Sequence, residues 1–156
     1  MRVMTSDIGG LDKVQAYRKV LVGYDGSDNS RRALKRAIEI VKQSSGELRI
    51  LVVVDTISFS ARSMAQFSSS VTNAMFEQAE TTLAEALDAA KKAGVKAWGQ
   101  VESGGPSDMI LAYAAETKAD LIVVGRRGMR GIMRFLMGSV SSSVMSHSEC
   151  DVLVVK

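Results

Sequence analysis

Short apolar runs alternate along this chain with longer stretches in which apolar residues recur every three or four positions. Runs rich in Val, Ile and Leu are typical of buried strands, whereas the recurring pattern has the period of an amphipathic helix. The predicted strands cover residues 20–24, 48–54, 95–101, 121–124 and 152–155. The predicted helices run from residue 28 to the Ser-Ser-Gly stretch at 44–46, from residue 76 to Gly94, from 106 to about 118, and from 139 to 148. Strands and helices therefore take turns along most of the chain.

Residues with special backbone preferences mark several of these boundaries. Asp28, Asn29 and Ser30 are all favoured N-cap residues at the start of the first helix. Pro106 is preorganised for the first position of a helix, and Gly94 suits the position just after a helix end. The helical predictions thus rest on end signals as well as on periodicity.

Two segments lack the periodic pattern. The Ser-rich stretch of residues 56–70 shows no clear period, and we expect a long loop there. Residues 1–18 also show none and contain a Gly-Gly pair, so we expect a mobile N-terminal extension. A length of 156 residues fits one domain, because domains usually contain about 100–200 residues. We place that domain at residues 19–156.

Strands that alternate with helices predict the α/β class. Each strand-helix-strand unit forms a right-handed crossover between parallel strands, so the helices cover both faces of the sheet. We therefore expect a single-domain three-layer α/β/α sandwich around a five-stranded parallel sheet. In such sheets ligands bind beyond the carboxyl ends of the strands, where the strand order reverses.

Composition excludes several classes of protein. A formal charge of +3 is a mild excess that suits an anionic ligand without requiring nucleic acid. With only Cys150 and His147, the chain has no intrachain disulfide and too few ligands for a typical zinc site. No apolar run approaches the roughly 20 residues needed to span a membrane. We therefore expect a cytoplasmic protein that neither enters membranes nor is secreted.

The loop after the first predicted strand contains a candidate ligand-binding carboxylate. Asp25 lies between Gly23 and Gly26, and glycines let a backbone approach a ligand closely. Its carboxylate could accept hydrogen bonds from a ribose hydroxyl or help to hold a metal. The alternative is that Asp25 only caps a turn or the following helix. An Asp-Gly pair alone does not decide between these roles.

The glycine-rich loop after the fourth predicted strand is a candidate phosphate site. Its backbone N–H groups can converge on phosphate oxygens, and Gly138-Ser139 opens a helix whose positive dipole end favours an anion. Four arginines add positive charge: Arg126, Arg127, Arg130 and Arg134. The alternatives are glycines that serve turns and arginines on a solvated face. No Gly-Lys pair or Gly-x-Gly occurs, which excludes a P-loop and the dinucleotide fingerprint.

The spacing of this loop resembles that of the ATP-binding universal stress proteins. Those proteins carry a glycine, two residues, a glycine, nine residues, and then a glycine followed by serine or threonine. The matching positions here are Gly125, Gly128, Gly138 and Ser139. The strand motif that ends at Asp25 and the stretches 51–55 and 150–155 are also similar, so the resemblance covers residues 19–156.

The resemblance implies a fold and a set of site residues. It implies the adenine nucleotide α-hydrolase-like fold of universal stress proteins, with the strand order 3-2-1-4-5. By the same resemblance Gly23 and Asp25 would line the nucleoside site, and Val53 would contact adenine through its backbone. The four residues of the loop motif would hold ribose and phosphates. Two departures from the family pattern stand out. Asp151 replaces a usual proline, and Arg126, Arg127 and Met129 stand where many members have serine and histidine.

Three functions remain open at this stage. We interpret the chain as an ATP-binding universal stress protein, with Mg²⁺, that acts as a nucleotide-dependent regulatory or stress-response module with little intrinsic turnover. Its protein partner is unknown, and nucleic acid is a less favoured partner. One alternative is a slow Mg²⁺-dependent ATPase; another is a docking module for an acidic protein or RNA. An uncovered last strand, together with the resemblance, also predicts a homodimer through that strand.

Overall fold

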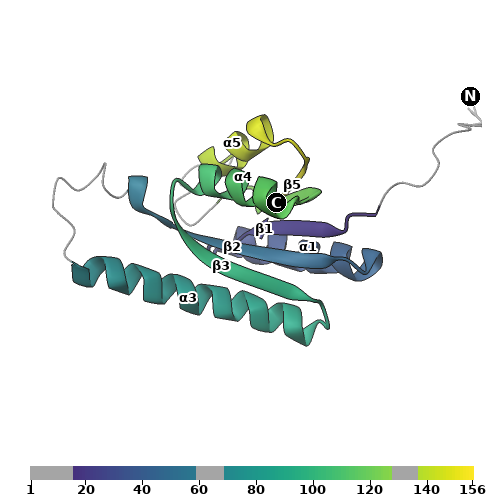
Figure 1. Cartoon of the computed structure of the whole chain (residues 1–156), viewed down its shortest axis with the longest axis horizontal. Helices are drawn as coiled ribbons and strands as arrows, with labels where there is room; N and C mark the ends of the chain where they lie inside the picture. Colours follow the sequence, from purple (N-terminus) through teal and green to yellow (C-terminus); the bar gives the residue numbers. More distant parts are fainter. Residues whose placement is uncertain (1–15, 59–68, 128–136) are drawn as a thin grey trace, which may run out of the picture.

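The computed structural model describes residues 16–58, 69–127 and 137–156. Over these residues strands and helices alternate as predicted (Figure 1). The strands are β1 (Lys19–Gly23), β2 (Glu47–Asp55), β3 (Ala97–Gly104), β4 (Leu121–Gly125) and β5 (Asp151–Val155). The helices are α1 (Asp28–Ser44), α3 (Ser69–Lys92), α4 (Pro106–Thr117) and α5 (Ser139–His147).

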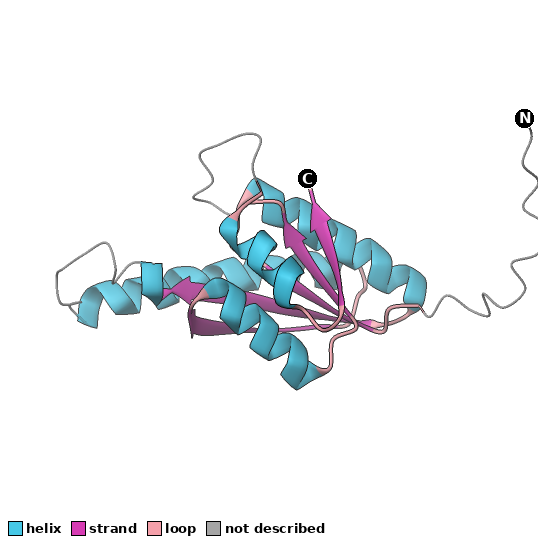
Figure 2. Cartoon of the chain, turned by 90° about the horizontal axis from the view of Figure 1, so that it is seen from above, coloured by secondary structure: helices cyan, strands magenta, loops and turns pink. Residues whose placement is uncertain are grey.

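Within the described residues the strands form one five-stranded parallel sheet in the order β3-β2-β1-β4-β5. Helices α1 and α3 pack on one face of it, and α4 and α5 pack on the other. The strands fan out when the molecule is seen from above (Figure 2), as the twist of a parallel sheet requires. The three-layer sandwich and the strand order implied by the resemblance are both confirmed.

Alternation along the central strands divides the core into two layers. Val20 and Val22 of β1 face α1 and α3, whereas Leu21 between them faces α4 and α5. All three side chains are fully buried. Burying such a side chain contributes about 1.5–3 kcal/mol, so the apolar runs that predicted the strands also stabilise them against both helical layers.

The first helix begins differently from the prediction. Its N-cap is Ser27, whose Oγ accepts a hydrogen bond from the N–H of Ser30 at 3.2 Å. Gly26 has a φ of +76°, which turns the chain so that Ser27 adopts the extended conformation of an N-cap. Asp28, Asn29 and Ser30, the predicted caps, therefore lie inside the first turn.

Two other boundaries also differ. The third strand runs from Ala97 to Gly104 instead of 95–101, because the N–H of Val95 still closes the end of α3 on the oxygen of Ala90. It continues to Gly104 because β2 offers partners as far as Asp55. The long helix α3 begins at Ser69, within the predicted loop, and residues 59–68 of that loop lie outside the described residues.

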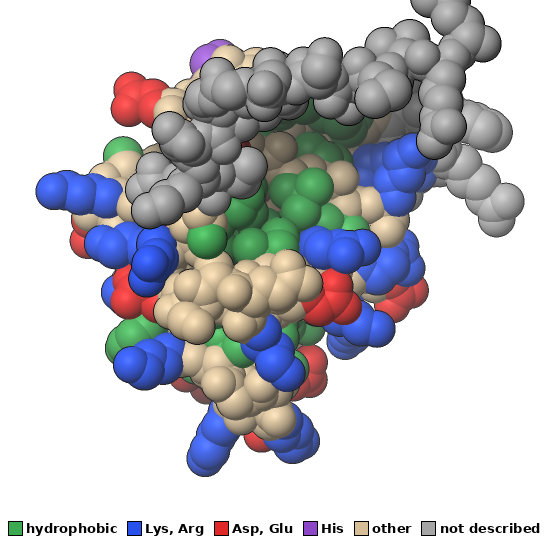
Figure 3. Space-filling model, turned by 90° about the vertical axis from the view of Figure 1, so that its right-hand side faces the viewer, with side chains coloured by type: hydrophobic (Ala, Val, Ile, Leu, Met, Phe, Trp, Pro, Cys, Tyr) green, Lys and Arg blue, Asp and Glu red, His purple; other side chains and the backbone are tan. Residues whose placement is uncertain are grey.

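The amino ends of the central strands are held by one carboxylate. Asp120, just before β4, accepts hydrogen bonds from the N–H groups of Arg18 at 2.8 Å and Lys19 at 3.1 Å. Figure 3 views the molecule from this end, where basic and acidic side chains are mixed around apolar ones. In the described parts of the chain, no helix is both long and apolar enough to cross a membrane.

Candidate functional site

The strand order reverses between β1 and β4, at the centre of the sheet. From β1 the chain moves outward to β2 and β3, and it then returns to the other side of β1 as β4 and β5. Val22 of β1 pairs with Val123 of β4, so Asp25 and Gly125 both follow this pair at the carboxyl ends of neighbouring strands. The fold therefore places both predicted site loops at its expected ligand-binding edge.

Asp25 organises the turn that leads into α1. Its Oδ1 accepts a hydrogen bond from the N–H of Ser27 at 3.0 Å, and its own N–H lies 3.4 Å from the Oγ of Ser30. The side chain is half-buried. This is the turn-capping role left open by the sequence.

Gly125 lies directly against the first turn of α1. A Cβ atom at this position would lie 2.7 Å from the carbonyl carbon of Asn29 and 2.9 Å from its oxygen. These are backbone atoms that cannot rotate away, so only glycine lets β4 and α1 approach this closely. A Cβ at Gly23 would meet the flexible end of Ile110 at 2.8 Å. Gly125 therefore has a packing role that its place in the phosphate motif does not reveal.

Val53 presents its main chain to the space beyond the end of β1. The last pair between β1 and β2 is Gly23 with Leu51, and the oxygen of Leu51 accepts a hydrogen bond from the N–H of Tyr24 at 2.9 Å. Main-chain groups of alternate residues point to the same side of a strand. Val53 therefore directs its N–H and C=O toward the same side as Leu51, past the last β1 pair, where a planar group could take the place of a strand.

The start of α5 is tied to the end of β4. Gly138 is the N-cap of α5, and its N–H donates to the oxygen of Arg126 at 2.9 Å. The buried Oγ of Ser141 lies 2.9 Å from the same oxygen. The N–H groups of a first helical turn have no partner within the helix, and the helix dipole makes this end positive. The exposed Ser139 lies at that end, as predicted.

The structure brings most of the predicted residues to one edge of the sheet. Gly125 and Gly138 are connected through Arg126, and Asp25 lies at the end of the adjacent strand. Val53 lies one strand farther from this loop, on β2, and Gly23 ends β1. Gly128 lies outside the described residues, and so do Arg130 and Arg134. Among the residues that are described, no group of His, Cys, Asp and Glu has the arrangement of a metal site.

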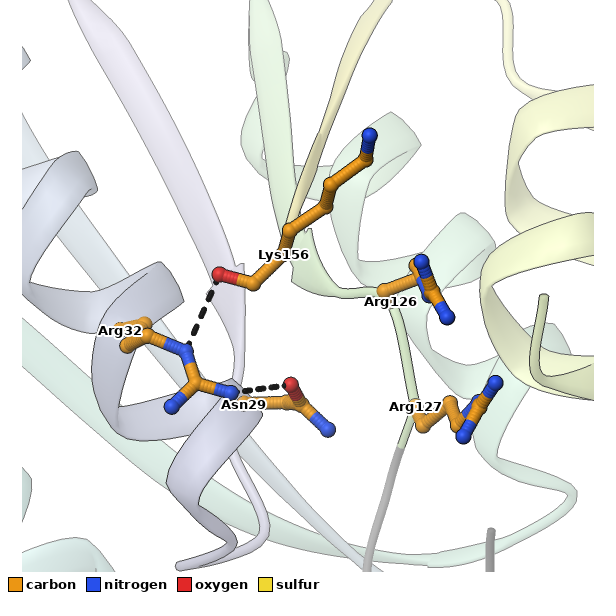
Figure 4. Close-up of a pocket in the computed structure, with 5 residues that line it drawn as sticks. All are labelled: Asn29, Arg32, Arg126, Arg127 and Lys156. Carbon is orange, nitrogen blue, oxygen red and sulfur yellow. Dashed lines mark hydrogen bonds between the residues drawn. The ribbon is translucent and has the colours of Figure 1, made fainter. Parts of the chain in front are cut away.

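A pocket of about 220 Å³ opens beside this edge, beyond β4 and β5 (Figure 4). It is lined by Asn29, Arg32, Arg126, Arg127 and Lys156. Of these, the sequence indicated only the two residues that follow β4. Asn29 and Arg32 lie three residues apart on α1, a spacing that puts them on one helix face. The sequence alone therefore places Asn29 and Arg32 on one helix face. Their proximity to Lys156, in contrast, depends on the pairing of β4 with β5.

Comparisons with known proteins agree with this architecture. A model of the universal stress protein family matches residues 16–156. The chain is 35% identical over 140 residues to a universal stress protein of Methanocaldococcus jannaschii, covering 90% of this chain and 82% of that protein.

Solved structures show the same likeness. A universal stress protein crystallised in complex with cAMP is similar with 35% identity and a TM-score of 0.70, covering 90% of this chain and 98% of that one. A universal stress protein of Lactobacillus plantarum is similar with 27% identity and a TM-score of 0.69, covering 90% and 98%. The chain therefore belongs to the universal stress protein family.

Proposed function

We propose that this protein binds an adenine nucleotide, ATP with Mg²⁺, at the carboxyl ends of β1, β2 and β4. The observation that carries the proposal is the convergence of three different binding elements where the strand order reverses. These elements are the Asp25 turn, the outward main chain of Val53, and the positive end of α5 next to Gly125. Each one matches a different part of a nucleotide. The structure in complex with cAMP belongs to a relative with 35% identity, which supports the same ligand class here.

Each element has a chemical role in this proposal. The N–H and C=O of Val53 pair with the edge of adenine, as strand main chain does in a sheet. The Asp25 carboxylate accepts hydrogen bonds from ribose hydroxyls. Ser139 and the first N–H groups of α5 hold phosphate oxygens, because that helix end is positive. Gly23 and Gly125 keep the adjoining backbone close, and Gly128 completes the loop motif in the family pattern.

ATP with Mg²⁺ fits the donors that are present. Backbone N–H groups, a hydroxyl and arginines suit a polyphosphate, whereas a carboxylate and phosphate oxygens are the ligands that Mg²⁺ prefers. Asp25 is the described residue in the strand-end loops of β1 and β4 that can supply such a carboxylate.

We favour regulation by nucleotide occupancy over turnover. The one histidine of the chain is His147, at the far end of α5 from Ser139. Eight residues of helix separate them by about 12 Å, too far for His147 to act as a general base at the first turn. A cytoplasmic stress-response role and an unidentified protein partner complete the proposal.

We also propose a homodimer through β5. This strand is an edge of the sheet, and its residues Val152 to Val155 are only partly buried. Val155 accepts from the N–H of Arg126, so its main chain faces β4 and that of Val154 faces outward. An apolar edge strand with outward main-chain groups favours pairing with a second copy.

The proposal is tested by asking which nucleotide accompanies the protein. The full chain is purified without added nucleotide and denatured with acid, and the released material is separated by chromatography. The test variant is Ser139→Asp, since aspartate suits a first helical turn but repels phosphate. Ser146→Asp adds the same charge at the opposite, exposed end of α5 as a matched control.

We expect the wild type and the control variant to release an adenine nucleotide, and Ser139→Asp to release little or none. Titration of the stripped protein with ATP should show the same order of affinity. A stripped wild type that ignores ATP, AMP and cAMP alike would refute nucleotide binding. Equal ATP binding by all three proteins would show that the phosphates do not bind at the start of α5.

A further inference from the structure

A second group of basic residues lies beside the proposed nucleotide site, on the side of the sheet covered by α1. The pocket described above is formed by three segments that are far apart in the chain: the first turns of α1, the residues after β4, and the residue after β5. The last β4–β5 pair is Gly125 with Val155, so Arg126 and Lys156 emerge together from the sheet. Gly125 then holds the first turn of α1 against this exit.

Arg32 is fixed in place by two hydrogen bonds. Its Nη2 donates to the Oδ1 of Asn29 at 2.6 Å, and its Nε donates to the main-chain oxygen of Lys156 at 3.0 Å (Figure 4). These bonds use two of the five N–H donors of the guanidinium. Little side-chain entropy remains to be lost when the others bind an anion, because the group is already ordered.

The same contact sets the direction of the Asn29 amide. Since its Oδ1 accepts from Arg32, its Nδ2 must point the other way. Figure 4 shows this nitrogen directed away from Arg32, on the side where Arg127 lies. Asn29 therefore offers N–H donors to the pocket and keeps its acceptor oxygen occupied. An amide oriented in this way favours an acceptor ligand over a cation.

The charged side chains that line the pocket are all basic. Four of the described residues that line it are basic, one is an amide, and none is Asp or Glu. Arg126 and Arg127 also line the pocket, with their side chains extending away from Arg32 in Figure 4, and Lys156 lines it from the end of β5. This differs from the amino end of the sheet in Figure 3, where acidic side chains lie among the basic ones. The charged side chains of the pocket thus differ from those at the amino end of the sheet.

We propose that this pocket binds a phosphoryl group, held by Asn29 and Arg32 and attracted by Arg126, Arg127 and Lys156. The volume of about 220 Å³ is large enough to admit a phosphate or a pyrophosphate. The phosphoryl group has two possible sources: free inorganic phosphate species, or the terminal phosphate of the nucleotide in the neighbouring site. Only the second source rests on the proposed function.

The first arm of the test uses inorganic pyrophosphate without nucleotide. Calorimetric titration of the full chain at fixed ionic strength compares the wild type with Arg32→Gln and Arg36→Gln. Arg36 is an exposed arginine one turn further along α1 that pairs with Glu39, so its loss changes net charge equally. We expect Arg32→Gln to weaken pyrophosphate binding about tenfold or more, and Arg36→Gln to change it little.

A second variant protects the test from misfolding. Asn29→Asp keeps an oxygen that can accept from Arg32 and adds a negative charge favoured in a first helical turn, so the fold should persist. The same charge repels a phosphoryl group. We expect this variant to unfold at the urea concentration of the wild type or above, and to lose pyrophosphate binding. Retained binding in a folded Asn29→Asp protein would overturn the proposal.

The second arm identifies the source of the phosphoryl group. If it is the terminal phosphate of a nucleotide, Arg32→Gln should weaken ATP binding more than AMP binding, and pyrophosphate should compete with ATP. If it is inorganic, pyrophosphate binding should depend on Arg32 while both nucleotides are unaffected. A protein that binds pyrophosphate through Arg32 but binds no nucleotide would refute the proposed function alone. Absence of an Arg32-dependent effect in both arms would refute phosphoryl binding in this pocket.

Discussion

The phenol of Tyr17 donates a hydrogen bond of 2.7 Å to the Oδ2 of Asp151, joining the segment before β1 to the first residue of β5. Asp151 is one of the positions where the chain departs from the family pattern described above. The chain therefore has a hydrogen-bond acceptor at the first residue of its edge strand β5. This acceptor holds Tyr17, which the sequence analysis assigned to the N-terminal extension. The boundary at residue 18 stays a prediction.

This contact predicts a pH-dependent contribution to stability. The hydrogen bond to Asp151, with smaller contributions from burial and from the negative charge of Asp151, raises the pKa of Tyr17 above its usual value. A raised pKa in the folded state means that the stabilisation is present below the unfolded pKa of about 10 and is lost as pH rises through the folded pKa. Because Tyr17 is only partly buried, we expect Tyr17→Phe to cost only about 0.5 kcal/mol at neutral pH.

Urea unfolding of the wild type and Tyr17→Phe at neutral and alkaline pH measures this effect. The difference between the two proteins should be present at neutral pH and should shrink above about pH 10. A difference that grows with pH would contradict the assignment of the proton to the phenol. A second variant, Asp151→Asn, should lower the pH at which the phenol ionises, as followed by its ultraviolet absorbance.

The contact between Gly125 and Asn29 predicts a strong packing effect. In Gly125→Ala the new methyl carbon would have to push apart the end of β4 and the first turn of α1. We expect a loss of about 1–3 kcal/mol in the free energy of unfolding, measured with urea in the absence of nucleotide. Gly138→Ala is the matched control, because its φ is −68° and its Cβ would lie 3.2 Å from the nearest atom, the oxygen of Arg126.

The control variant should lose clearly less stability than Gly125→Ala. Equal stability of Gly125→Ala and the wild type would mean that this glycine is not needed for packing. Contact with the ligand would then be the remaining reason for a glycine at position 125 of the loop motif.

Asp25 allows turn formation and ligand binding to be separated. Asp25→Asn keeps an oxygen that can accept from the N–H of Ser27, whereas Asp25→Ala does not. We expect Asn to leave the urea midpoint nearly unchanged and Ala to cost about 1 kcal/mol. If the carboxylate charge serves Mg²⁺, Asn should weaken ATP binding in the presence of Mg²⁺ more than in its absence.

The same variants address turnover. Phosphate release that requires Mg²⁺ and disappears in Asp25→Ala would favour the slow ATPase over a purely regulatory module. Unchanged ATP binding in a folded Asp25→Ala protein would mean that Asp25 stabilises the turn before α1 and does not bind the nucleotide.

The fold was predictable because its strands are buried on both faces. Such strands have continuous apolar sequences. Because a helix connects each strand to the next, few arrangements other than a parallel sheet are possible. The location of Asp25 and Ser139 was predictable from chain order, because Asp25 lies in the loop after β1 and Ser139 begins α5; their roles as ligand-binding residues stay predictions. The spatial order of the strands came from the family resemblance, since no residue pattern in the chain specifies it.

What could not be predicted depends on contacts between distant segments. Ser27 became the N-cap in place of its neighbours because Gly26 adopts a positive φ, which a local pattern does not reveal. Arg32 resembles any solvated arginine on a helix until the exit of β5 supplies Lys156 beside it. The phosphoryl pocket therefore exists only once β4, β5 and α1 have been assembled.

The orientation of β5 predicts how the proposed homodimer can be disrupted without damage to the monomer. The main chain of Val154 faces away from β4, so Val154→Pro removes an N–H that the monomer does not use within the sheet. Proline is tolerated on an edge strand at such a position, and its neighbour Leu153 is already extended. We expect the wild type to sediment as a dimer at micromolar concentration and Val154→Pro to sediment as a folded monomer. Val154→Ala, which keeps the N–H, is the control and should remain dimeric. A monomeric wild type, or a Val154→Pro variant that stays dimeric, would place any self-association on another surface, because pairing through β5 requires these outward main-chain groups.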